Sequence, residues 1–315
     1  MTCHNCSEAE MFKFGFKNGN QRYKCRVCKR TRSDIPPKPL DNLRVPFDKA
    51  VQITHLLVEG VGIRAIERLA SVHRDTVLAV LKVVGQKCAR LLDQRVRNAP
   101  FEFVQVDELF AFVGCKERNN TDKSAERGDQ YVYLGVDADS KFIINFIIGK
   151  RDPVTTQIYI QDLHKRVRTP FQLTTDGFAA YPNEIFYTFQ QGAHFAQLVK
   201  QYAAAIDGEK GYHRRYSPSH CTGARKLIRC GNPSPDKIST SYVERTNLSF
   251  RIFNRRFTRL TLGYSKKLAN LKHSVALFIA HFNFCRKHST IAQTPAQACG
   301  LADHQWTIEE LLKEI

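Results

Sequence analysis

The sequence lacks the segments that would place a protein in or across a membrane. It contains no apolar run near the roughly 20 residues that a membrane-spanning helix needs. Its start, Met1-Thr2-Cys3-His4, lacks the basic and then apolar pattern of a secretory signal peptide. No internal repeat is found. These absences predict a cytoplasmic protein with no membrane partner, in which the ten cysteines stay free of disulfide bonds.

Acidic residues are too few to balance the basic ones. The 315 residues include 48 Lys and Arg against 30 Asp and Glu, which gives a formal net charge of +18. The length allows one large domain and one or two small ones. This excess of positive charge predicts attraction to a polyanion, of which nucleic acid is the commonest. A ribosome or an anionic membrane surface would attract the same charge, so the sign alone does not choose the partner.

Two cysteine pairs with the spacing of metal ligands lie near the N-terminus. They are Cys3-x-x-Cys6 and Cys25-x-x-Cys28. Between them Asn18-Gly19 is a strong β-hairpin signal. A hairpin that gathers four thiolates supplies the tetrahedral sulfur set that zinc prefers, whereas four unrelated buried cysteines need no paired spacing. Residues 1–35 are therefore predicted to form a zinc ribbon that depends on its metal. Basic residues favour contact with DNA phosphates: Lys24, Arg26, Lys29, Arg30 and Arg32.

A proline-rich linker at 35–39 precedes a segment with helical periodicity, residues 45–96. Within it, the pattern predicts a short helix over Ile63–Ala70, a break at Ser71-Val72-His73, and the start of a second helix at Arg74. The two helices are expected to pack through Ile66, Leu69, Val72 and Val77. This spacing predicts an all-α helix-turn-helix domain whose second helix enters a major groove. We expect Arg74 and Thr76 near base edges, and Arg64 and Arg68 over phosphates. A plain helical hairpin would show the same pattern.

From residue 97 the pattern changes to alternating strands and helices. Strands are expected at 101–107, 131–136, 142–148 and 171–175, and helices at 153–168, 240–257 and 264–286. The polar, basic stretch at about 206–236 is predicted to be an insertion. This order predicts a mixed sheet with flanking helices over residues 97–289, followed by a C-terminal tail at 290–315. The fold class is therefore α/β.

Three acids in this region suggest a metal centre. Asp107 and Asp176 each end an apolar strand, and Glu244 lies on a predicted helix. Taken singly, such acids are more often caps or solvated side chains. Buried strand-end carboxylates, however, are costly unless a cation neutralises them. Three carboxylates can hold two metal ions, and all-oxygen ligands suit magnesium or manganese. Glu244 is also the only acid in a long cationic stretch: Arg245, Arg251, Arg255, Arg256, Arg259, Lys266, Lys267 and Lys272.

Other candidate ligands rank lower. Glu108 follows Asp107 but points to the opposite face of a continuous strand. Asp137 and Asp139 occupy a turn, where such residues are common, and Asp137 stays a reserve ligand. A second metal held by His213, His220, Cys221 and Cys230 is less favoured, because their spacing is irregular. The neighbouring Tyr212, Arg214, Arg215 and Tyr216 suit a DNA-contacting loop instead.

Five sequence blocks resemble the DDE transposases of bacterial insertion sequences, especially the compact insertion-sequence-one-like group. The blocks are Gln105–Leu109, Thr174–Tyr181, Ser241–Leu248, Arg255–Thr261, and His281–His288 followed by Thr294-Pro295. With the N-terminal segments, the resemblance covers nearly the whole chain. It implies an RNase H-like fold in which Asp107, Asp176 and Glu244 are the three metal-binding acids. The interval from Asp176 to Glu244 is longer than in the compact members.

The resemblance also implies a two-step reaction. Metal-activated water cuts a phosphodiester at the end of the element, and the freed 3′-hydroxyl then attacks target DNA. Arg245 and Asn247 would position the scissile phosphate, and Arg255 and Arg256 would contact DNA. The implied partners are double-stranded DNA, as terminal inverted repeats and target, and further copies in a homodimer or larger synaptic oligomer. This places the protein at the nucleoid.

Two alternatives belong to other classes. One is a catalytically silent DNA-binding protein, either a domesticated transposase or a zinc-ribbon regulator. The other is a different RNase H-like nuclease, such as a junction resolvase. The presence of all three acids argues against decay of the site. The ribbon and helix-turn-helix argue against a nuclease of plain RNA–DNA hybrids, which needs no sequence reading.

Overall fold

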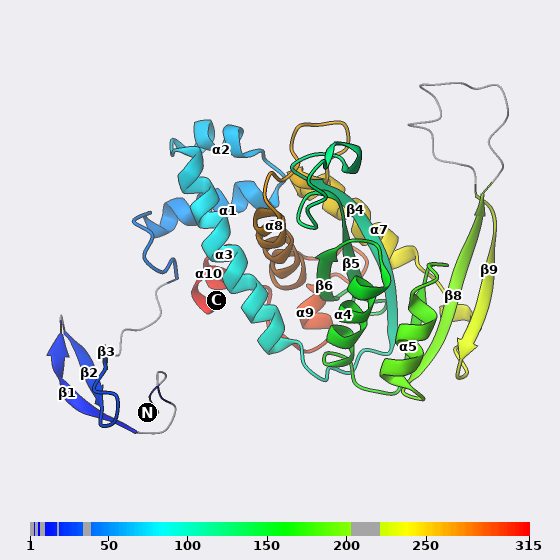
Figure 1. Cartoon of the computed structure of the whole chain (residues 1–315), viewed down its shortest axis with the longest axis horizontal. Helices are drawn as coiled ribbons and strands as arrows, with labels where there is room; N and C mark the ends of the chain where they lie inside the picture. The colour runs from blue at the N-terminus through cyan, green and yellow to red at the C-terminus, as the bar shows by residue number, and fades with distance from the viewer. Residues whose placement is uncertain (1–2, 4–5, 7–9, 18, 34–38, 203–220) are drawn as a thin grey trace. The chain divides into compact units, whose positions relative to one another are not determined.

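The computed structural model describes residues 3, 6, 10–17, 19–33, 39–202 and 221–315. Two compact units make up the chain, Met1–Asn42 and Leu43–Ile315 (Figure 1). Most of the expected linker and the loop bearing His213, His220, Tyr212, Arg214, Arg215 and Tyr216 lie outside the described residues. Among the residues that are described, no helix is long and apolar enough to cross a bilayer.

The first unit is built on a three-stranded antiparallel sheet. Its strands are β1 (Met11–Lys17), β2 (Asn20–Cys25) and β3 (Thr31–Ser33), in that spatial order. Lys17 pairs with Asn20 across a tight turn in which Gly19 has φ +77°, a conformation that glycine adopts without strain. The turn is therefore the hairpin that the sequence predicts, although Asn18 itself is outside the described residues. Among its described residues, Cys3, Met11 and Cys25 form a buried cluster, and Leu40 is buried as well.

The second unit begins with three helices, α1 (Phe47–Val58), α2 (Ile63–Ala70) and α3 (Arg74–Arg95). Ser71 takes the left-handed conformation and ends α2, and the His73 side chain accepts a hydrogen bond from the backbone N–H of Asp75. Ile66 and Val77 are buried as expected, but Leu69 is 61% exposed. The prediction for Leu69 is wrong, because Ala70, four residues after Ile66, lies closer to the buried face than Leu69, three residues after it.

The larger unit contains one six-stranded mixed sheet with the spatial order β6-β5-β4-β7-β8-β9. The strands are β4 (Phe103–Val113), β5 (Gly128–Asp137), β6 (Ile143–Gly149), β7 (Phe171–Thr175), β8 (Ala193–Tyr202) and β9 (Cys221–Cys230). The β4–β7 and β7–β8 pairs are parallel and the others antiparallel. A mixed sheet with flanking helices agrees with the RNase H-like class expected from the sequence.

Helices cover both faces of this sheet. Helix α4 (Pro153–His164) packs on one face, where the hydroxyl of its Tyr159 lies against Gly135 of β5. Helix α5 (Tyr181–Phe189) packs beside α4. Helix α7 (Ser241–Phe253) lies over the other face, because the side chain of Gln105 accepts hydrogen bonds from its first-turn N–H groups. Since neighbours on a strand point to opposite faces, Gln105 and Asp107 face α7, and Val106, the partner of Gly135, faces α4.

Helix α8 (Leu268–Ala280) continues into a π-helical turn, His281–Cys285, and joins the sheet to the N-terminal helices. Asn283 in that turn exchanges two hydrogen bonds with the backbone of Ile143 in β6. Arg166, just after α4, bonds Asp162 and Asp93 of α3. Helices α1, α2 and α3 are thus packed into the same compact unit as the sheet. Short 3-10 turns complete it: Glu117–Asn119, Pro235–Lys237 and Arg255–Phe257.

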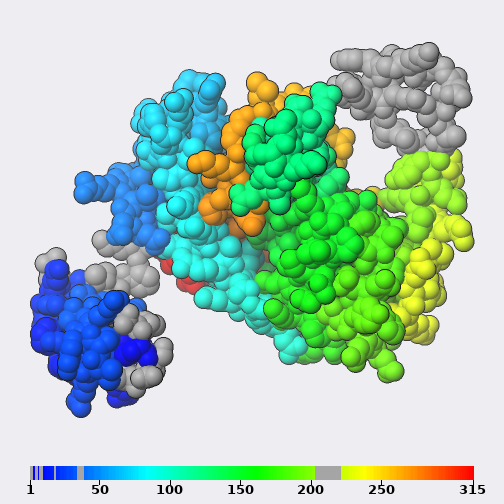
Figure 2. All heavy atoms as spheres, in the orientation of Figure 1, coloured from blue at the N-terminus to red at the C-terminus, as the bar shows by residue number. Residues whose placement is uncertain are grey.

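Five elements differ from the sequence-based expectations. No strand was predicted at β8 and no helix at α5. Part of the expected insertion, 221–230, is strand β9, which lies with β8 at one edge of the larger unit (Figure 2). The expected tail contains α9 (Pro295–Ala298) and α10 (Ile308–Glu314), both with capping boxes and buried apolar residues. Trp306 stacks on Phe284, so this end of the chain belongs to the core.

The close crossing of α3 and α8 at Gly85 gives a test of this packing. A Cβ atom at Gly85 would lie 2.5 Å from the His273 backbone oxygen, which cannot move without shifting α8. We expect Gly85→Ala to lower the free energy of unfolding by about 1–3 kcal/mol, the usual cost of overpacking. Denaturant titration measures this. Gly62→Ala, whose new Cβ meets only the Arg255 side chain at 3.8 Å, is the control; equal effects of both changes would refute the crossing.

Candidate active site

The three predicted acids line one open cleft of about 480 Å³ in the larger unit. Asp107 comes from β4, Asp176 from the residue after β7, and Glu244 from the first turn of α7. The cleft is also lined by two cationic side chains, Arg151 and Lys200. The structure therefore brings together all three acids from distant parts of the sequence.

The end of strand β7 explains why these acids meet. Strand β7 pairs with β4 only as far as Thr175, which lies opposite Val106. Beyond that pair β4 has no β7 neighbour, so Asp107 borders an opening in the sheet, and Asp176 turns into it. The position of Glu244 is fixed from the same strand, because Gln105 accepts hydrogen bonds from the N–H groups of Tyr242 and Val243. One strand thus positions two of the three acids.

Glu108 belongs to the acidic cluster, although the sequence pattern favoured Asp107 over Glu108 as a metal ligand. Its side chain does leave the opposite face of β4, where Tyr181 of α5 hydrogen-bonds it. Nevertheless, single carboxylate oxygens of Asp107, Glu108 and Asp176 all lie within 4.8 Å of one another. The opening beyond Thr175 lets side chains from both faces approach the same space. The alternation of side chains along a strand predicted the face of Glu108 correctly. A position on the opposite face nevertheless allows its carboxylate to lie near that of Asp107.

The local environment disfavours negative charge on β4. Burial raises the pKa of Asp107 to about 7, and the neighbouring charges of Glu108, Asp176 and Glu244 act in the same direction. Burial also raises the pKa of Glu108, with the charge of Asp176 adding to the effect. A cation near these carboxylates would favour their ionised forms. The cluster therefore has the electrostatic character of a cation-binding site.

Two basic side chains partly neutralise the cluster. Arg151 donates from Nε to Glu108 at 2.9 Å and from Nη2 to Asp176 at 3.1 Å, while its guanidinium lies over the Phe178 ring. Lys200 of β8 forms an ion pair with Glu244, whose Oε1 also accepts a hydrogen bond from Thr240 at 2.6 Å. No sequence pattern indicated either cation, because strand pairing and the loop before α4 bring them to the cleft.

The predicted DNA-contacting residues around α7 fall into two groups. Arg245 and Arg255 are exposed. Asn247 is buried and donates to Asp107 Oδ2 at 2.7 Å, so it contacts a carboxylate rather than solvent. Arg256 is enclosed as well, with its guanidinium bonded to Ser265 and Ser274. Asn247 and Arg256 therefore have internal partners where DNA contacts were expected.

The residues of α2 and α3 that the sequence predicts to contact DNA lie at or near the surface. Arg64 and Arg68 are exposed on α2, and Arg74 is exposed at the start of α3, with Thr76 half-buried one turn on. The backbone N–H of Arg74 donates to Glu67, which ties the two helices together across the break. The start of α3 thus presents basic side chains to solvent.

The reserve ligands have other roles. Asp137 accepts hydrogen bonds from the N–H and hydroxyl of Ser140, which suits a turn, and Asp139 pairs with Lys237. Cys221 and Cys230 stand at opposite ends of β9. A strand of that length separates them by roughly 30 Å at about 3.3 Å per residue, too far to share a metal.

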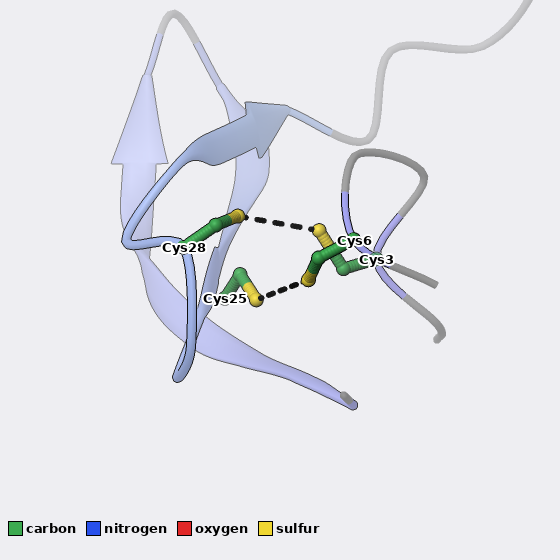
Figure 3. Close-up of side chains that lie close together, drawn as sticks. All are labelled: Cys3, Cys6, Cys25 and Cys28. Atoms are coloured by element: carbon green, nitrogen blue, oxygen red, sulfur yellow. Dashed lines mark hydrogen bonds between the residues drawn. The ribbon is translucent and has the colours of Figure 1, made fainter. Parts of the chain in front are cut away.

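The four N-terminal cysteines form a second cluster, in the smaller unit (Figure 3). The sulfur of Cys3 lies 3.6 Å from that of Cys28, and the sulfur of Cys6 lies 3.6 Å from that of Cys25. Four sulfurs at the corners of a tetrahedron around zinc would be about 3.8 Å apart. The backbone N–H of Cys28 also lowers the pKa of the Cys25 thiol, which favours the thiolate. The cluster therefore fits one tetrahedral metal ion.

Comparisons with known proteins add little. No family model matches the sequence, and no curated protein matches it. Among solved structures, the chain is similar to a piggyBac transposase in a synaptic complex with hairpin DNA, seen by cryo-electron microscopy. The identity is 11% and the TM-score 0.40, over 90% of this chain and 72% of that one. Similarity at this level does not assign the chain to a family.

Removal of one thiol should destabilise the smaller unit and leave the stability of the larger unit unchanged. We expect Cys25→Ser to lower the bound zinc from one ion per chain to none and to unfold the smaller unit, because so small a core depends on its metal. The larger unit should melt as before. Metal analysis and thermal unfolding measure both effects. Cys221→Ser, at an exposed cysteine of β9, is the control, and retention of zinc by Cys25→Ser would contradict the assignment.

Loss of the Asn247 amide should weaken divalent metal binding. This amide holds one oxygen of Asp107 in place, and loss of such a supporting contact typically costs about 10–100-fold in metal affinity. We therefore expect Asn247→Leu to raise the dissociation constant for Mn²⁺ by that factor, measured by electron paramagnetic resonance. Ser249→Ala, on the same helix, should leave it unchanged. Equal affinity in wild type and Asn247→Leu would remove Asn247 from the site.

Proposed function

We propose that this protein is a DDE transposase, which cuts DNA at the ends of an insertion sequence and transfers the freed 3′-hydroxyl to target DNA. The observation that carries the proposal is the convergence of Asp107, Asp176 and Glu244, from two strand ends and a helix, on one open cleft. The five sequence blocks that resemble this group include all three acids. The proposal concerns a polynucleotidyl transferase that depends on divalent metal.

The carboxylates of Asp107, Asp176 and Glu244 would hold magnesium or manganese, with Glu108 as an additional neighbour. When bound, such ions activate the attacking oxygen and stabilise the leaving oxygen of a phosphodiester. These donors fit magnesium or manganese, because they are carboxylate oxygens in a pocket that disfavours uncompensated negative charge. Asn247 keeps the Asp107 carboxylate in one orientation.

The cations of the cleft have a role in the same reaction. Arg151 and Lys200 each pair with a cluster carboxylate in this structure. Metal bound to those carboxylates would compete for the same oxygens and leave both side chains able to contact the phosphates of a DNA strand. Arg245, exposed one residue beyond Glu244, would contact the same strand.

The remaining surfaces suit recognition of the element ends. Exposed Arg64, Arg68 and Arg74 around the α2–α3 break would bind double-stranded DNA, with Thr76 near the bases. The four-cysteine cluster would hold zinc and form a zinc ribbon that precedes this domain in the chain. Because two element ends have to be joined, a homodimer or larger synaptic assembly at the nucleoid is part of the proposal.

A strand cleavage and joining assay tests this function. With magnesium and DNA that carries the element's own ends, we expect wild type to nick and join. Three changes should each reduce the rate of cleavage by more than the roughly 10–100-fold that removal of a supporting contact costs: Asp107→Ala, Asp176→Ala and Glu244→Gln. Asp139→Asn, at an exposed acid paired with Lys237, is the matched control.

The same assay separates the alternatives. Binding of the ends without cleavage by wild type would favour a silent DNA-binding protein. Cleavage without joining would favour another RNase H-like nuclease. Full cleavage by Glu244→Gln would remove that residue from the metal centre.

A further inference from the structure

One face of the small N-terminal sheet carries exposed aromatic rings. Phe12 and Phe14 of β1 are 39% and 41% exposed. Phe16 is 71% exposed, but it lies beyond a register shift and pairs with Gln21, on the other side of the sheet. Single exposed apolar residues on a protein surface are ordinary, but a contiguous group of them marks an interaction site. The rings of Phe12 and Phe14 contact each other edge to face, with centroids 6.3 Å apart.

Strand register shows that this face is not needed by the metal cluster. Met11 pairs with Cys25 and Lys13 with Tyr23, and Met11, Tyr23 and Cys25 pack together at the buried cysteines. Phe12, one residue along, pairs with Lys24 and therefore points to the opposite side. The zinc-binding core is thus complete without the phenylalanines.

The same face is strongly cationic. Lys24 lies 4.7 Å and Arg22 5.4 Å from the centre of the Phe14 ring, and Arg26 lies 5.7 Å from that of Phe12. Residues 11–33 contain eight Lys and Arg and no Asp or Glu. A protein partner that bound only through apolar contacts would gain nothing from these positive charges. Flat rings interleaved with cations match an unpaired nucleic acid strand, in which each nucleotide offers a base to stack and a phosphate to neutralise.

We infer that this aromatic face, formed by Phe12, Phe14, Arg22, Lys24 and Arg26, binds unpaired DNA by stacking its bases on the phenylalanine rings. Paired DNA keeps its bases stacked on one another and offers this face only phosphates. The site is separate from the cleft of the larger unit, and it goes beyond the proposed cleavage function. In that function, its substrate would be a strand exposed where a duplex has been opened.

The test compares two strands that differ only in their bases. Binding of the zinc-loaded full chain to a dT oligonucleotide and to an abasic oligonucleotide of equal length is measured by fluorescence anisotropy, without magnesium. Phosphate contacts are the same in both strands, so the ratio of dissociation constants reports stacking. We expect wild type to bind dT about tenfold more tightly, the scale of one or more stacked bases.

Substitutions assign that preference to the aromatic face. Phe14→Leu and the double change Phe12→Leu with Phe14→Leu should bring the ratio towards one, whereas Phe14→Tyr, which keeps the ring, should preserve it. Phe186→Leu removes an exposed ring of α5 in the larger unit and is the matched control. Metal analysis checks the ribbon, and Phe12→Leu alone serves if a change at 14 releases zinc.

A wild-type ratio of one, or a ratio that the leucine variants leave unchanged, overturns the inference. So does ring-dependent self-association of the chain in sedimentation, because a second copy would then cover this face. Cleavage is not measured, so failure of the catalytic proposal leaves this result intact, and the reverse also holds.

Discussion

Repulsion between carboxylates is the constraint around which the larger unit is arranged. Asp107, Glu108 and Asp176 lie within a few ångströms of one another in a partly buried pocket, and Glu244 lines the same cleft. Burial raises the pKa of Asp107, and the like charges of its neighbours raise it further, so negative charge in these surroundings is costly. The structure places Arg151, Lys200 and the Asn247 amide against these groups, so each carboxylate has a positive or donor partner. A bound divalent cation would add to this compensation.

The sheet supplies the precision that this cluster needs. Strand β7 stops at Thr175, one residue before the level of Asp107, and so opens a space between β4 and β8. Gln105 anchors the start of α7 two residues before Asp107, which couples the helical acid to the strand acid through one buried side chain. Rigid elements hold side chains more precisely than loops do. The site is therefore carried by the core of the fold and not by its surface.

The two units depend on different physics. The larger one has an extensive apolar core, into which the C-terminal helices also pack through Trp306 and Leu311. Among its described residues, the smaller one buries only Cys3, Met11, Cys25 and Leu40. So little apolar surface cannot fold a sheet alone, which is why four thiols in tetrahedral reach matter there. A core that needs so few side chains also leaves the phenylalanines of β1 free for contacts with a partner.

Local patterns in the sequence determined the hairpin at Gly19, the α2–α3 break and strand β7, because turn residues and periodicity act over a few neighbours. The cysteine spacing and the strand-end acids likewise indicated two metal-binding sets. Strands β8 and β9, the enclosure of Asn247 and Arg256, and the arrival of Arg151 and Lys200 at the cleft were decided only by the tertiary structure. Their positions depend on pairing between segments far apart in the chain, and no local pattern encodes which surface a side chain will meet.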